Sequence, residues 1–429
     1  MTRGSQEPSL LAQARDWART GDARAEAAFQ HVVDAEPACV EAHVFIARHA
    51  LGRGDTVRAL QHLQQACRAE PGNPKLLREL AAVAEAAGFT DEARQALGYA
   101  VAIAPNFYEA HLQLARLLER LGERHQATRS YFRALTRAQF DGQWLDDQTT
   151  PAHLLAQVRH AVAFVQRGRV EVLAGLLEPL QARFGSEAMR RVERCLMGYL
   201  GVDPVVPADP LQRPKFLFFP GLPSTPFLDT ADIDWIDRIE AAFEGIRQEA
   251  LQAIADDGAL APFLVFGADD PVENYLDGDA AAPPRWDALF FYRHGQRCAE
   301  NHVRCPITSQ ALESLPLLRI AGHAPEICFS VLSPGTHILP HHGVTNVRAV
   351  VHLPLIVPGQ CALTVGTQTH AWREGRCVAF DDTYRHEAWN RSGQTRVILL
   401  MDAWNPHLTE PERAAVTALI EGIGEFNRG

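Results

Sequence analysis

At 429 residues the chain is too long for one ordinary hydrophobic core, so we expect two or three domains. Its composition, 47% apolar and 22% charged, is typical of a globular protein in water. The formal net charge of −11 argues against a nucleic-acid partner, because binding to phosphates needs a basic face.

The N-terminal segment, the apolar runs and the cysteines indicate the cellular compartment of the protein. Residues 1–11 lack the apolar segment of a secretory signal, and no run approaches the ~18 apolar residues that a membrane helix needs. Eight cysteines without a C-x-x-C pair predict neither a disulfide framework nor a zinc site. We therefore expect a cytoplasmic protein with reduced thiols and no membrane span, although Cys298 and Cys305 are close enough in sequence to leave a bridge open.

The first third of the chain repeats with a period of 34 residues. Proline closes an apolar segment once in each period, glycine marks a turn, and alanine or a bulky apolar residue returns at fixed places. The series are Pro37, Pro71 and Pro105; Gly54, Gly88 and Gly122; Ala25, Ala59, Ala93 and Ala127; Ala66, Ala100 and Ala134; and Phe29, Leu63, Leu97 and Tyr131.

This pattern resembles the tetratricopeptide repeat, in which small residues let paired helices approach and glycine forms the turn between them. Helical patterning continues to residue 199, so we expect a repeat domain over residues 1–200. A purely structural or self-associating role and the recruitment of a peptide or protein substrate both remain open for it.

A change in composition comes after the repeats. Seven prolines between residues 204 and 226 interrupt any helix and predict a linker over residues 201–226 that docks on the next domain. Residues 233–256 predict one amphipathic helix or two short ones. Short runs rich in β-branched and aromatic residues then predict strands at 286–294, 326–333, 346–357, 362–365, 376–381 and 396–403. We expect a multidomain α + β chain whose last domain, residues 227–429, is a jelly roll of the double-stranded β-helix type.

Two histidines, His341 and His386, stand 45 residues apart among these strands, and Arg396 comes ten residues after the second. Two imidazoles held by β-strands and a nearby arginine indicate a non-haem iron oxygenase that uses 2-oxoglutarate. In the common facial triad a carboxylate stands two residues after the first histidine, on the same strand face. Here that position is Gly343. Asp381 and Asp382 favour turn formation or the orientation of a histidine, and direct ligation by either is the second interpretation.

Four segments resemble the aspartyl/asparaginyl β-hydroxylases: residues 341–346 (HHGVTN), 351–355 (VHLPL), 380–389 (FDDTYRHEAW) and 402–406 (DAWNP). The resemblance spans about residues 215–407. It implies an iron(II) and 2-oxoglutarate dependent dioxygenase with two histidine ligands, His341 and His386, and with dioxygen as the oxidant. It also implies that Tyr292, Ser330, His352 and Arg396 contact 2-oxoglutarate. Arg396 offers a planar fork that suits the distal carboxylate.

The substrate implied by the resemblance is the β-carbon of an aspartyl or asparaginyl residue in a peptide or protein. One departure bears on it: the family arginine two residues before the family histidine is Val350 here, so we assign the substrate carboxylate to Arg348, on the same strand face. Two alternatives remain open: the same chemistry on a free or carrier-tethered amino acid, a small metabolite or a lipid acyl chain, and a catalytically silent repeat scaffold.

Overall fold

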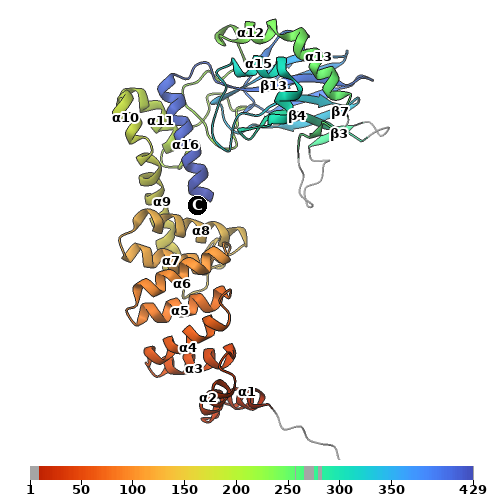
Figure 1. Cartoon of the computed structure of the whole chain (residues 1–429). Helices are drawn as coiled ribbons and strands as arrows, with labels where there is room; N and C mark the ends of the chain where they lie inside the picture. Colours follow the sequence, from red (N-terminus) through yellow and green to blue (C-terminus); the bar gives the residue numbers. More distant parts are fainter. Residues whose placement is uncertain (1–8, 257, 265–274, 279–282, 429) are drawn as a thin grey trace, which may run out of the picture. The chain divides into compact units, whose positions relative to one another are not determined.

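The computed structural model describes residues 9–256, 258–264, 275–278 and 283–428. The chain divides into two compact units, Met1–Arg169 and Val170–Arg428, and helix α9 (Leu155–Gly175) runs across the division. The first unit is helical, and the second combines two sheets with helices (Figure 1).

The first unit is built from helix pairs. Each helix packs against its neighbours in sequence, as the stacked segments of Figure 1 show. The helices are α1 (Leu10–Thr20), α2 (Ala25–Ala35), α3 (Val40–Gly52), α4 (Thr56–Ala69), α5 (Pro74–Ala86), α6 (Thr90–Ile103), α7 (Tyr108–Arg120) and α8 (Arg124–Phe140).

The 34-residue period is confirmed as a structural repeat. Gly54, Gly88 and Gly122 lie in the turns that join α3 to α4, α5 to α6 and α7 to α8, and each has a positive φ that favours glycine. The recurring small and bulky positions are buried where neighbouring helices meet, including Ala59, Ala93 and Ala127, Ala66, Ala100 and Ala134, and Phe29, Leu63, Leu97 and Tyr131.

The compact repeat unit ends before residue 200, the predicted end of the repeat domain. Helices α10 (Glu178–Phe184) and α11 (Ser186–Tyr199) belong to the second unit, where they pack against α16 (Glu410–Arg428). Met189 and Leu196 of α11 share a hydrophobic cluster with Phe219 and Val416. The contacts with α16 join residues more than 200 positions apart, which a sequence pattern of local period does not reveal.

The predicted proline-rich linker lies against the β-rich domain. The amide of Arg213 donates to the carbonyl of Thr383, and the amide of Phe219 donates to the side chain of Asn346. Its backbone therefore has partners in the next domain, as expected of a docked linker.

The second unit contains two antiparallel sheets. The larger has the strand order β1 (Phe227–Leu228), β11 (Val378–Phe380), β8 (Arg348–Ile356), β13 (Arg396–Trp404), β6 (Ile327–Leu332), β4 (Trp286–Arg293) and β2 (Ala261–Pro262), with β5 (Gln296–Arg297) paired to β4. The smaller has the order β10 (Gln368–His370), β9 (Cys361–Val365), β12 (His386–Asn390), β7 (Thr336–His341) and β3 (Leu276–Gly278). A helical region before a β-rich domain is therefore confirmed.

Side-chain alternation gives the larger sheet two different faces. On β8, Val351 and Leu353 join an outer core with α12 (Ile236–Ala241) and α13 (Phe243–Ile254), whereas Val350 joins a cluster with residues of the smaller sheet. The remaining helices are η1 (Thr230–Asp232), α14 (Ala299–Arg304) and α15 (Pro306–Glu313). The alternation places the odd-numbered β8 residues under helices and the even-numbered ones between the sheets.

The cysteines and the character of the helices complete the description of the fold. All eight cysteines, Cys298 and Cys305 included, are free thiols. Among the residues with described positions, no helix has the length and apolar character needed to cross a bilayer.

Candidate active site

The two predicted metal ligands are direct cross-strand neighbours. His341 ends β7, His386 begins β12, and the two residues oppose each other in the antiparallel register. Opposed residues present their side chains on one face of a sheet. The imidazole centroids lie 4.1 Å apart with the rings tilted by 54°. The sheet therefore brings together two histidines separated by 45 positions in the sequence.

Hydrogen bonds fix how these imidazoles present their nitrogens. His341 Nδ1 lies 2.8 Å from the carbonyl oxygen of Leu339, and His386 Nδ1 lies 3.0 Å from that of Tyr384. A carbonyl only accepts, so each Nδ1 carries the proton and each Nε2 keeps its lone pair. Burial lowers the pKa of both histidines, that of His386 to about 4. Both rings are thus neutral near pH 7, the state that binds a metal.

In a facial triad a carboxylate stands two residues after the first histidine. Here that position is Gly343, and the carboxyl group of Asp382, from the segment before β12, lies beside it. A Cβ at Gly343 would overlap the carboxyl group of Asp382, so this glycine leaves room for that carboxylate. Asp382 Oδ2 pairs with Arg348, and its Oδ1 is buried without a hydrogen-bond partner. Over the described ranges, no group of three His, Cys, Asp or Glu side chains has the arrangement of a metal site.

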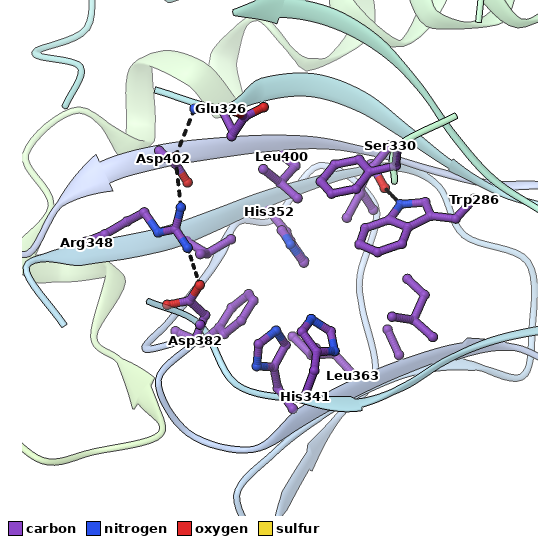
Figure 2. Close-up of a pocket in the computed structure, with 18 of the residues that line it drawn as sticks. Trp286, Glu326, Ser330, His341, Arg348, His352, Leu363, Asp382, Leu400 and Asp402 are labelled. Carbon is purple, nitrogen blue, oxygen red and sulfur yellow. Dashed lines mark hydrogen bonds and ion pairs between the residues drawn. The ribbon is translucent and has the colours of Figure 1, made fainter. Parts of the chain in front are cut away.

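A cavity of about 240 Å³ opens beside the histidines and lies between the two sheets (Figure 2). Apolar side chains form most of its wall, among them Val350, Leu363, Phe380, Ile398 and Leu400. His352 points into it from β8, and Trp286 and Ser330 lie together on its far side from Asp382. Such a lining excludes water and strengthens the few polar contacts that it contains.

One end of this cavity holds an unpaired cation. Arg396 is 1% exposed. Among the described contacts, its guanidinium donates a long hydrogen bond of 3.4 Å to Ser330 Oγ and lies 5.3 Å from the centroid of the Trp372 ring. Its Nε has no partner, and no described carboxylate forms an ion pair with it. Burial lowers the pKa of Arg396 to about 10. A buried charge without a counterion is costly, so this end of the cavity is suited to an anionic ligand.

Ser330 and His352, which were expected to contact 2-oxoglutarate, lie beside this cation. Ser330 Oγ accepts a hydrogen bond of 2.9 Å from Trp286 Nε1, which leaves the serine proton free to be donated into the cavity. His352 is buried, its Nδ1 has no partner, and burial together with Arg396 holds its pKa well below the usual range. The structure thus brings Ser330, His352 and Arg396 together around one cavity.

Tyr292, the fourth residue expected to contact 2-oxoglutarate, does not line the cavity. A β-bulge between Phe290 and Tyr292 shifts the alternation of β4, so Tyr292 opposes Ile327 and packs in the outer core. Its ring contacts His302 and lies under the guanidinium of Arg319. Trp286, earlier on the same strand, occupies the cavity wall instead.

The other end of the cavity holds a cation that is already neutralised. Arg348 forms an ion pair with Asp382 from the segment before β12 and a second one, of 3.2 Å, with Asp402 on β13 (Figure 2). Both carboxylates are buried. One guanidinium between two carboxylates leaves no net positive charge for a substrate carboxylate, the role that the sequence suggests for Arg348.

Comparisons with known proteins show the family of this chain. Residues 240–406 match the family described as aspartyl/asparaginyl beta-hydroxylase, and residues 50–98 match a tetratricopeptide repeat. Aspartate beta-hydroxylase domain-containing protein 2 of Rattus norvegicus is 30% identical over 56% of this chain and 68% of its own length. The chain belongs to the aspartyl/asparaginyl β-hydroxylase family.

Other members of this family differ in the substrate that they are named for. The ornithine lipid ester-linked acyl 2-hydroxylase of Rhizobium tropici is 33% identical over 46% of this chain and 67% of its own length. The aspartyl/asparaginyl beta-hydroxylase of Homo sapiens is 33% identical over 31% of this chain and 18% of its own length. The chain spans 55% of the first of these relatives, the domain-containing protein 2 of Xenopus tropicalis.

The cavity residues of this family member that were not singled out from the sequence include Trp286, Glu326 and Asp402. The sequence did contain a signal for Asp402, since an acidic residue inside the apolar run of β13 must pair with another group when it is buried. Trp286 and Glu326 stand at the ends of predicted strands, where the sequence alone does not show which way a side chain points.

Proposed function

We propose that this chain is an iron(II) and 2-oxoglutarate dependent hydroxylase. The observation that carries the proposal is a pair of neutral imidazoles, with free Nε2 lone pairs, in the same apolar cavity as a buried arginine that lacks a counterion. Two imidazoles suit a divalent transition metal, and the arginine suits a carboxylate. A catalytically silent scaffold would have no physical reason to retain a buried, unpaired guanidinium.

The residues present fit an iron ion held by two protein ligands. His341 and His386 would bind it through Nε2, and the Leu339 and Tyr384 carbonyls keep both rings in the required tautomer. Asp382, whose buried Oδ1 lacks a partner, would accept a hydrogen bond from a metal-bound water. Bound ferrous iron supplies the activation of dioxygen, so that one oxygen atom enters a substrate C–H bond as hydroxyl while 2-oxoglutarate becomes succinate and carbon dioxide.

The remaining polar groups of the cavity would position 2-oxoglutarate. The Arg396 guanidinium would bind the distal carboxylate, and the Ser330 hydroxyl, oriented by Trp286, would donate to the same group. His352 is neutral beside Arg396 and would hydrogen-bond to the cosubstrate without repelling that cation. The apolar wall would keep water from the reacting atoms.

We also infer that the two sheets form the predicted double-stranded β-helix. The strand orders β11-β8-β13-β6 and β10-β9-β12-β7 support this, because strands that are consecutive in sequence alternate between the sheets over much of this path. Such a winding places β7, β12 and β13 around one cavity, which is where the histidines and Arg396 are found.

The repeat unit would recruit a peptide or protein, as such repeats commonly do. Helices α6, α7 and α8 line a hollow that includes Gln95, Leu114 and Gln126. Filling it with Gln95→Trp is expected to raise KM for a long protein substrate and to leave a short substrate unaffected. An equal effect on both would remove the recruitment proposal.

We also propose a cytoplasmic location, with which the free thiols are consistent.

The test of the proposed chemistry is succinate formation from 2-oxoglutarate with ferrous iron. We expect His386→Ala to abolish it and to abolish binding of one divalent metal ion per chain. His337→Ala is the matched control, because His337 lies on the same sheet but pairs with Glu387 outside the cavity. Undiminished turnover in the His386 variant, or no succinate and no metal binding in the intact chain, would refute the proposal.

A further inference from the structure

Two loops flank the candidate metal ligands. Residues 342–347 follow His341 at the end of β7, and residues 381–385 precede His386 at the start of β12. Neither loop is part of a strand, and the pairing of β7 with β12 ends at the two histidines, with a register shift beside them. The ladder of this strand pair does not extend into the loops, so other contacts must fix them.

A segment of the linker, residues 212–219, contacts both loops and is here called the clamp segment. On the loop before β12, Gln212 forms an isolated antiparallel bridge with Tyr384. The next amide, that of Arg213, donates to the Thr383 carbonyl at 2.8 Å. The backbone of the linker thus gives this loop hydrogen-bond partners that the sheet does not supply.

The same segment continues onto the loop after β7. The Lys215 amide donates to the Gly343 carbonyl at 3.0 Å, and the Leu217 amide donates to the Val344 carbonyl at 3.1 Å. Leu217 is fully buried. Because one short segment binds both loops, it fixes them relative to each other as well as one by one.

One of these contacts leads directly to a candidate metal ligand. The carbonyl that accepts from His386 Nδ1, at 3.0 Å, belongs to Tyr384, the residue that Gln212 bridges. This carbonyl sets both the direction of the imidazole and the nitrogen that carries its proton. The clamp segment therefore acts on the orientation of His386 Nε2 through Tyr384.

The side chain of Gln212 strengthens the same contact. It is 2% exposed, its Nε2 donates to Asp381 Oδ2 at 2.6 Å, and its Oε1 accepts from Ser224 Oγ at 3.1 Å. Asp381 begins the loop before β12, three residues from Tyr384. Displacing a buried amide that is hydrogen-bonded at both ends costs free energy, so Gln212 anchors the clamp segment to this loop.

We infer that the clamp segment completes the candidate metal site, and that Gln212 is a positioning residue for His386. The inference rests on the proposed function, in which His341 and His386 bind the metal ion. The segment lies before residues 240–406, the range that matches the family. Without its anchor the loops can shift, so the two imidazoles are no longer preorganised for one ion, and the affinity for metal falls.

The test compares two variants that each remove a buried hydrogen bond of 2.6 Å to a carboxylate. Gln212→Met removes the bond to Asp381, and Thr308→Val removes the bond from Thr308 Oγ1 to Glu249 on α13. Calorimetry measures the binding of manganese(II) to the full chain, and urea unfolding measures stability. We expect similar losses of stability, a fall of about tenfold in metal affinity for Gln212→Met alone, and no change for Thr308→Val. Equal metal affinities in the two variants would overturn the inference.

A second pair of variants tests the backbone of the clamp segment. Arg213 is exposed, so Arg213→Pro removes its amide donor to Thr383 without removing a buried side chain, and Arg213→Ala keeps that donor. We expect Arg213→Pro to lower the manganese affinity about fivefold and Arg213→Ala to leave it unchanged. Equal effects of these two substitutions would contradict a role of the amide.

The tautomer of His386 separates this inference from the proposed function. Nitrogen-15 NMR of the metal-free protein is expected to place the proton on Nδ1 in the intact chain and to show both tautomers in Gln212→Met. An intact chain that binds no metal, but whose tautomer depends on Gln212, would refute the proposed function and support the positioning of His386. An intact chain that binds metal, with an affinity and a tautomer that Gln212→Met leaves unchanged, would overturn the inference alone.

Discussion

Two arginines on paired strands line the same cavity, Arg396 buried and Arg348 half-buried, and their surroundings differ. Arg348 on β8 is held between two carboxylates, whereas Arg396 on β13 faces none among the described residues. Arg348, which is already paired, stabilises the fold. Arg396 is buried without a described carboxylate beside it, so it is the arginine suited to bind an anionic ligand.

The largest difference should appear when each cation is removed. Arg348→Met leaves the buried carboxyl groups of Asp382 and Asp402 without a cation, and such a loss costs about 3–5 kcal/mol of unfolding free energy. Arg396→Met removes a charge whose described contacts are a long hydrogen bond to Ser330 and the ring of Trp372, without a carboxylate, so the ligand-free protein should lose little stability or gain some. Urea unfolding of both variants at pH 7 measures this. Similar losses in the two variants would contradict the assignment of roles.

The affinity for 2-oxoglutarate should depend more strongly on Arg396 than on Arg348, the reverse of their effects on stability. Arg396→Met is expected to lower its affinity by about 100-fold, because a buried charge-assisted contact is lost. Arg396→Lys keeps the charge without the planar fork and should retain part of the affinity. Titration in the presence of a redox-inert divalent metal measures both. An affinity that survives Arg396→Met would assign the carboxylate to another residue.

Asp381 extends the comparison of Arg348 and Arg396, because it is a buried carboxyl group that pairs with no described arginine. Its side chain accepts from Gln212 and Thr383, and burial raises its pKa from 3.8 to about 6. Because the folded state binds this proton more tightly, the contribution of Asp381 to the unfolding free energy should rise as the pH falls from about 7 to about 4, by on the order of 3 kcal/mol.

The variant Asp381→Asn cannot titrate and should lose this dependence. Urea unfolding at several pH values compares its slope with that of the intact chain. If the two slopes are equal, another group is responsible for the pH dependence.

A smaller effect is expected from an added cation. Val350→Arg places a second arginine on the strand face of Arg348, where the cavity carries an excess of carboxylates. We expect turnover of an aspartyl peptide, relative to that of a neutral substrate of the same length, to rise about tenfold, because the added guanidinium gives the peptide carboxylate a partner. An unchanged preference between the two substrates would place the substrate carboxylate elsewhere in the cavity.

Much of the architecture could be predicted because it depends on local patterns. The 34-residue period placed the glycine turns of the repeats, and six alternating runs correspond to β4, β6, β8, β9, β11 and β13. Strands β7 and β12, which carry the histidines, were not among these runs, since Pro340 and several polar residues interrupt their apolar alternation. Their histidines were found through motif resemblance.

What could not be predicted depends on contacts between distant residues. The ion pairs of Arg348 join positions 34 and 54 residues apart, and they decide whether that cation is free. A single bulge in β4 moved Tyr292 out of the cavity, because one extra residue reverses the side-chain alternation. The extent of the repeat unit depends on the packing of α11 against α16.

The most direct test is a crystal structure with a redox-inert divalent metal and a 2-oxoglutarate analogue. We expect the metal on Nε2 of His341 and His386, the distal carboxylate of the analogue on Arg396, and Arg348 still paired with Asp382 and Asp402. An analogue carboxylate bound to Arg348, or a metal bound away from the two histidines, would contradict the account.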